Sequence, residues 1–92
     1  MMMSDLTKFF HNAHNNNVKL RFWFEDNIND DARLMYVKDI FANSKGDLEG
    51  LVLGTDKDKN HKWEHFRWND IVKFGLDKFQ KNILKGGLSN GN

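Results

Sequence analysis

The chain contains no cysteine and no proline among its 92 residues. The absence of cysteine excludes disulfide bonds, thiolate-bound zinc and catalysis by a thiol nucleophile. No apolar run approaches the roughly 20 residues that a membrane-spanning helix needs, and the sequence shows no secretory signal peptide. We therefore expect a cytoplasmic protein without a membrane partner, which would act in the host cytoplasm if the chain is viral.

An excess of charge of one sign is also absent. The chain has 14 lysine and arginine residues against 13 aspartate and glutamate residues, and its formal net charge is +1. This balance argues against an acidic mimic of DNA and against a strongly basic protein that coats DNA. Any binding of nucleic acid must therefore depend on where individual charges lie.

Aromatic residues are abundant, with eight phenylalanines, three tryptophans and one tyrosine. Each buried ring removes about 150–250 Å² from water, so a few rings can build the core of a small chain. The length suits one domain, over residues 4–86, and we expect residues 1–3 and 87–92 to be disordered termini. Assembly into a homo-oligomer would add buried surface to so small a core.

Two segments have the apolar spacing of a helix face. The first covers residues 5–14, where Ser4 is the expected N-cap and the Asn15–Asn17 run ends the pattern. The second begins after Gly75 and ends before Gly86, which fits the position that follows a helix. The apolar positions of the two expected helices are Leu6, Phe9, Phe10 and Ala13, and then Leu76, Phe79, Ile83 and Leu84.

The segments between the two helices are rich in β-branched and aromatic residues, and polar turns separate them. Alternation of apolar and polar residues is clearest over residues 18–25. Short turns favour antiparallel pairing, so the sequence predicts an α+β fold that is mainly β: an N-terminal helix, a five-strand antiparallel SH3/Sm-like barrel and a C-terminal helix. The expected strands are 18–25, 33–41, 48–55, 61–68 and 71–74.

Two of the expected strands place basic and aromatic residues on one row. Successive side chains of a strand point to opposite faces, so burial of the apolar row displays the other row. Bases stack on exposed aromatic rings, while lysine and arginine neutralise phosphates. The alternative is that a terminal helix covers the outer face of one strand and makes Trp23 or Trp63 part of the core. The displayed residues would be Lys19, Arg21 and Trp23 in one strand, and Trp63, His65 and Arg67 in the other.

No spacing indicates a metal site or a catalytic centre. Asp56, Asp58 and Asn60 match the first ligands of an EF-hand loop, but Arg67 stands where the bidentate glutamate belongs. The histidine pairs fit a solvated helix end and an exposed strand better than a metal site. We expect no catalytic residues, no metal, no cofactor and no enzyme activity. The two pairs are His11 with His14 and His61 with His65.

Four segments carry a resemblance to a known family: Val18–Phe24, Arg33–Val37, Gly50–Thr55 and Phe66–Ile71. Together they resemble the WYL domain, an SH3/Sm-like ligand-binding module of bacterial transcription regulators. The resemblance implies that the chain senses nucleotides or single-stranded nucleic acid, with Arg21, Arg33 and Arg67 as ligand contacts. The chain departs from the family's pattern at two sites, because Leu51–Leu53 replaces the Trp-Tyr-Leu triplet and Asp70 replaces an arginine.

Two functions from different classes remain open. The first is a small regulatory protein that binds single-stranded nucleic acid or a nucleotide on a basic and aromatic sheet face. The second is a phage or mobile-element inhibitor or adaptor that binds a host protein. Tryptophan and arginine are common hot spots of protein interfaces, so the same surface suits both functions.

Overall fold

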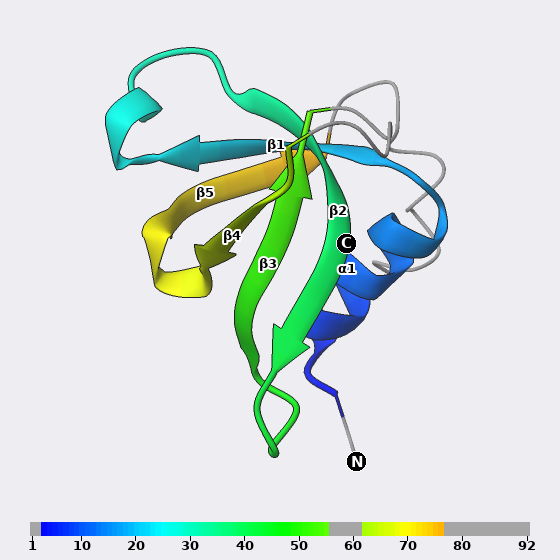
Figure 1. The fold of residues 1–92 in the computed structure, drawn as a ribbon. Helices are drawn as coiled ribbons and strands as arrows, with labels where there is room; N and C mark the ends of the chain where they lie inside the picture. Colours follow the sequence, from blue (N-terminus) through cyan, green and yellow to red (C-terminus); the bar gives the residue numbers. More distant parts are fainter. Residues whose placement is uncertain (1–2, 56–61, 77–92) are drawn as a thin grey trace.

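The computed structural model describes residues 3–55 and 62–76. Over this part of the chain one helix precedes five strands, which form an antiparallel sheet in the order β4-β3-β2-β1-β5 (Figure 1). The fold is therefore α+β and mainly β, as the sequence predicts. The elements are α1 (Asp5–Asn15), β1 (Lys19–Phe24), the 3₁₀ helix η1 (Glu25–Asn27), β2 (Arg33–Ala42), β3 (Leu48–Gly54), β4 (Glu64–Arg67), the 3₁₀ helix η2 (Trp68–Asp70) and β5 (Ile71–Leu76).

Helix α1 begins at the predicted residue and ends at Asn15, one residue later than predicted. The Ser4 side chain accepts a hydrogen bond from the backbone N–H of Thr7, which satisfies one of the free donors of the first turn. The helix ends before Asn17, whose φ of 54° lies in the left-handed region that asparagine tolerates better than most residues. The buried face is Phe9, Phe10 and Ala13 together with Thr7, and it packs towards the sheet.

Strand β1 shows the predicted alternation of burial. Leu20, Phe22 and Phe24 are buried in the core, and the residues between them face outward. The strand lies between β2 and β5, with Arg21 opposite Leu34 on one side and opposite Gly75 on the other. The centre of this three-strand unit is thus fixed by hydrogen bonds on both edges of β1.

In the second half of the chain two strands differ in extent from the prediction. The expected strand 61–68 is shorter at both ends, because β4 begins only at Glu64, after residues 62 and 63, and Trp68 enters η2, where its ring still packs on the core. The expected strand 71–74 continues to Leu76, which pairs with Leu20 and is therefore a strand residue rather than the start of a helix. The rest of the expected C-terminal helix, residues 77–85, lies outside the described residues.

The sheet curls so that its distant strands face each other. The rings of Phe24 in β1 and Phe66 in β4 stack with centroids 4.6 Å apart, although β2 and β3 separate these strands in the sheet order. Within the described residues β4 pairs with β3 and β5 pairs with β1, and the two edge strands are joined by η2 rather than by a ladder. We call the gap along the free edge of β4 the seam of the barrel.

The core is built largely from aromatic rings, as the composition suggests. Phe10 of α1 is fully buried and contacts Phe22, Trp68 and Phe74 at centroid distances of 5.1–6.2 Å. Figure 1 shows α1 beside β2, on the right of the view. Among the described residues no helix is long and apolar enough to cross a membrane.

Candidate functional site

Three of the predicted binding residues lie together on the outer face of β1. Arg21 is exposed, Lys19 and Trp23 are half-buried, and Lys73 of β5 lies directly opposite Trp23 in the antiparallel register. The alternation of β1 places its three residues on one face, and the register with β5 brings Lys73 beside them. We call Lys19, Arg21, Trp23 and Lys73 the basic face.

Trp23 is the centre of the basic face and is held by three contacts. The guanidinium carbon of Arg21 lies 5.2 Å from the centroid of the indole ring, and the Nζ atom of Lys73 lies 4.5 Å from it. The indole N–H donates a hydrogen bond of 3.1 Å to the backbone oxygen of Asp30. Both cations are within the range of cation–π attraction, so the indole orients Arg21 and Lys73 on the surface of the sheet.

The outward strand positions around this cluster are uncharged or basic. Lys19 places its Nζ atom 5.4 Å from the ring centroid of Tyr36, the residue opposite it in β2. Leu34 is 40% exposed beside Arg21, and the guanidinium lies above Gly75, where a side chain would restrict it. None of these outward strand positions carries a carboxylate, so the basic face has a positive local charge despite the neutral balance of the chain.

Arg33, a ligand contact implied by the family resemblance, lies elsewhere. Its Nη2 atom donates to Oδ2 of Asp26 over 2.7 Å, and its guanidinium lies 5.2 Å from the ring centroid of Phe24. The aspartate already accepts this donor and neutralises its charge. Arg33 is therefore less suited than Arg21 to bind an anion, and its role as a ligand contact stays a prediction.

Arg67 has a similar ion pair at the other side of the seam. Its Nε atom donates to Oδ2 of Asp70 over 3.0 Å, and its Nη2 atom donates to Oδ1 over 3.3 Å. This hydrogen bonding and the charge of Asp70 raise the pKa of Arg67 above its ordinary value. Asp70 thus competes with an anionic ligand for the same guanidinium.

The two remaining predicted residues face outward on the sheet near β4. His65 is exposed, lies over Gly50 and contacts the ring of Phe41 edge-on, with centroids 5.2 Å apart. Trp63 is half-buried and has the Nζ atom of Lys38 at 4.9 Å from its ring centroid. Trp23 and Trp63 are both half-buried, and neither belongs to the core cluster of the described residues. The C-terminal segment that could also cover them lies outside the described residues.

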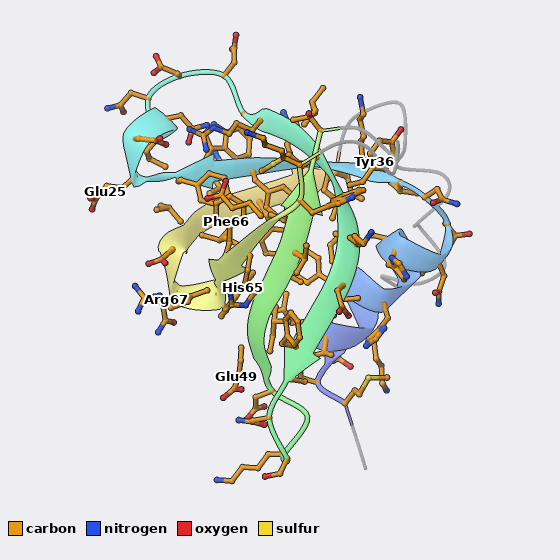
Figure 2. The ribbon with its side chains drawn as sticks, viewed as in Figure 1. Glu25, Tyr36, Glu49, His65, Phe66 and Arg67 are labelled. Atoms are coloured by element: carbon orange, nitrogen blue, oxygen red, sulfur yellow. The ribbon has the colours of Figure 1, made fainter. Side chains whose placement is uncertain are left out.

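A groove of about 740 Å³ lies along the seam. Figure 2 shows Glu25, Phe66 and Arg67 on this side of the molecule, away from Tyr36. The groove contains Arg33, His65 and Arg67 but no residue of the basic face. Its lining comes from the end of β1, η1, the start of β2, β4, η2 and β5: Phe24, Glu25, Asp26, Arg33, Glu64, His65, Phe66, Arg67, Asn69, Asp70 and Val72.

The structure thus divides the seven predicted residues between separate places on the surface. Sequence alone missed Lys73 because no pattern states which strands are neighbours, and it missed the acidic lining of the seam for the same reason. The one available signal for Lys73 was its position between the apolar Ile71 and Phe74, in a segment already expected to be a strand. The register then decided that Lys73 lies opposite Trp23.

The basic face and the exposed residues near β4 offer cations and aromatic rings that can contact a ligand. Within residues 3–55 and 62–76 no group of three or more histidine, aspartate or glutamate side chains is placed to hold a metal ion. His14 uses Nδ1 to hydrogen-bond the backbone oxygen of Val37 over 2.8 Å, which ties the end of α1 to β2. The expected EF-hand-like residues 56, 58 and 60 lie outside the described residues.

Comparison of the chain with models of protein families, with curated proteins and with solved structures gives no match. Function is therefore inferred from the geometry and charge of the described surface. The basic face is the part of that surface on which cations and an aromatic ring are held together without a neighbouring carboxylate on the strands.

Proposed function

We propose that the protein is a small non-enzymatic regulatory protein of the cytoplasm that binds single-stranded nucleic acid or a nucleotide on its basic face. The observation that carries the proposal is the cluster of Arg21 and Lys73 around Trp23. The family resemblance implies the same class of ligand and includes Arg21 among its contacts.

The phosphates of the ligand would bind the three cations of the basic face. Lys19, Arg21 and Lys73 form no ion pair with a carboxylate of the described residues, whereas Arg33 and Arg67 each do. A guanidinium or ammonium group without a carboxylate partner can bind a phosphate without first losing an ion pair. Arg21 suits this role best, because it is exposed and its position is set by Trp23 and Gly75.

The bases would stack on the plane that Arg21 forms over the indole. Arginine guanidinium planes and aromatic rings both serve as stacking surfaces in single-strand recognition. The exposed Leu34, opposite Arg21 in β2, adds an apolar surface beside the stack. Such contacts depend on the faces of the bases, so we expect tolerance of sequence and a preference for single strands over duplexes.

The proposal can be tested by fluorescence anisotropy with a labelled ten-nucleotide oligothymidine at low salt. If three cations neutralise phosphates, the slope of log K against log salt should be roughly −2, from about −0.7 for each phosphate of a single strand. Arg21→Ala should weaken binding about tenfold or more, because it removes a phosphate contact and the stacking plane, and a stacked base is worth ~1–3 kcal/mol.

Arg67→Ala is the matched control, since it removes an exposed arginine that Asp70 already neutralises. It should change the affinity less than about twofold, in line with the small effect of exposed ion pairs. Equal losses in Arg21→Ala and Arg67→Ala, or no binding by the wild-type protein at low salt, would contradict the proposal. Circular dichroism of both variants checks that they fold.

A further inference from the structure

The groove along the seam follows the free edge of an edge strand. All four residues of β4, from Glu64 to Arg67, line it. Successive residues of a strand point to opposite faces, so a groove on one face would be lined by every second residue only. Contact with all four places the groove beside the backbone of β4, on the side that does not pair with β3.

An edge of this kind is a template for another strand. Half of the backbone N–H and C=O groups of an edge strand point away from its partner, and an extended peptide can pair with them. In the described residues no strand pairs with β4 on this side. The 740 Å³ of the groove lies within the volume range of ligand sites.

The charge of the groove is negative, in contrast to the basic face. Four carboxylates line it, and two of them, Asp26 and Asp70, are neutralised by Arg33 and Arg67. The other two, Glu25 and Glu64, form no ion pair within the described residues. The charges of these two glutamates are therefore not neutralised by an ion pair of the described residues, and one lies at each side of the seam.

The floor of the groove is apolar. Phe66 of β4 is half-buried, stacks on Phe24 and lines the groove together with it. Val72 of β5 is 56% exposed, the largest exposure of any large apolar side chain among residues 3–55 and 62–76. An apolar side chain placed over Phe66 and Val72 would remove both from water.

We propose that this groove binds an extended segment of a partner protein that is rich in lysine or arginine and in apolar residues. The segment pairs its backbone with the free edge of β4. Glu64 and Phe66 point to the same face of β4, so the row of side chains on that face contains both kinds of residue. Its apolar side chains cover Phe66 and Val72, and its cations lie near Glu25 and Glu64. The carboxylates, the apolar floor and the strand edge are the complement of such a segment in charge, polarity and backbone geometry.

The proposal is independent of nucleic-acid binding, because the groove and the basic face share no residue. The test uses the full chain and a capped eight-residue peptide in which Lys-Lys-Val-Val is repeated, so that each row of side chains holds both lysine and valine. Binding is followed by calorimetry and by NMR. We expect saturable binding at low salt, with the amide shifts largest in residues 64–67 and 72. The same peptide with glutamate in place of lysine should bind at least tenfold more weakly, since like charges then meet in the groove.

One further peptide and one double variant separate edge pairing from a general attraction of opposite charges. The lysine–valine peptide with alternate backbone nitrogens methylated keeps its charge but cannot donate to the edge of β4, and it should lose at least tenfold in affinity. The Glu25→Gln/Glu64→Gln double variant should weaken binding of the unmethylated peptide about three- to tenfold. Glu49→Gln, an exposed glutamate of β3 outside the groove, is the control and should change it less than twofold.

Several results would overturn the proposal. They are equal binding of the methylated and unmethylated peptides, equal binding by the double variant and the Glu49→Gln control, and shifts centred on the basic face instead of β4. Sedimentation that shows a homodimer displaced by the peptide would identify a second copy of this chain as the occupant, and it too would overturn the proposal. Thermal unfolding of each variant confirms that an altered affinity is not a loss of folding.

Discussion

The three arginines that the family resemblance implicates differ through their neighbours. Arg21 lies on Trp23 and above Gly75, whereas Arg33 and Arg67 each donate to an aspartate seven or three residues away in sequence. The guanidinium group is the same in all three, so only its surroundings decide whether its charge is available. This is why Arg21 is the arginine to which we assign the ligand.

Gly50 is a residue at which close packing requires the absence of a side chain. A Cβ atom there would lie 2.6 Å from Nε2 of His65 and 3.0 Å from the backbone oxygen of Phe66. The imidazole can move away because it is exposed, but the carbonyl belongs to the β3–β4 ladder. Gly50 therefore lets β4 and its outward side chain approach β3.

We expect Gly50→Ala to reduce the free energy of unfolding by about 1–3 kcal/mol, the usual effect of overpacking. Urea denaturation followed by circular dichroism measures the loss. Gly75→Ala is the control: a Cβ atom there would meet the nearest Arg21 atom at an ordinary 3.5 Å, so the change should stay within ~0.5 kcal/mol.

A double-mutant cycle of Gly50→Ala and His65→Ala separates the contact with the imidazole of His65 from the contact with the backbone oxygen of Phe66. If the imidazole contributes to the strain, Gly50→Ala should be less destabilising in the His65→Ala background, by roughly 0.5 kcal/mol or more. A Gly50→Ala variant as stable as the wild-type protein would show that β4 does not pack on Gly50 as the structure has it.

At the scale of elements, α1 is attached to the sheet at both of its ends. Thr7 in its first turn is fully buried and donates from Oγ1 to the backbone oxygen of Gly46 over 3.0 Å, in the turn between β2 and β3. His14 in its last turn bonds the backbone oxygen of Val37. The helix is thus held to the β2–β3 hairpin by polar contacts as well as by its apolar face.

We expect Thr7→Val to lower the free energy of unfolding by about 1–2 kcal/mol, because the variant keeps the shape of the side chain but leaves a buried carbonyl with one donor fewer. Thr7→Ser should recover part of the loss, since it restores the hydroxyl. Lys8→Ala changes an exposed neighbour on the same helix and serves as the control in chemical denaturation. If Thr7→Val and Lys8→Ala had the same free energy of unfolding, the hydrogen bond from Thr7 to Gly46 would not stabilise the fold as we expect.

Element boundaries followed local signals where the signals were strong. The Ser4 cap, the asparagine run after α1 and the alternation of β1 each fix a boundary through contacts within a few residues. The bounds of β4 and the end of β5 at Leu76 depend instead on pairing with distant strands, and the sequence placed them wrongly. The register shift after Trp23 is likewise a property of two strands together.

At the scale of the whole molecule, one cluster of aromatic rings connects α1 with β1, η2 and β5. Phe10 joins α1 to Phe22 of β1, Trp68 of η2 and Phe74 of β5, so its removal affects both ends of the chain at once. Charge is distributed in the opposite way. A nearly neutral chain carries a positive face on β1 and β5 and a negative groove along β4, and each suits a different ligand.

We expect Phe10→Ala to cost about 3–5 kcal/mol, the usual loss for a large buried ring. A chain of this size has a total stability on the order of 5–15 kcal/mol, so the melting temperature should fall by more than about 10 °C. Phe41→Ala is the control, because this ring is 43% exposed and lies outside the core cluster. Calorimetry should show single transitions for both variants, and similar melting temperatures would contradict the central place of Phe10.

The sequence by itself determined the fold class, α1 and the inner and outer rows of β1. These follow from periodicity and capping, which act over a few neighbouring residues. Only the tertiary structure decided that Lys73 joins Trp23, that aspartates neutralise Arg33 and Arg67, and that the barrel has an acidic seam. Each of these depends on which distant segments become neighbours, and the register and curvature of the sheet set that arrangement.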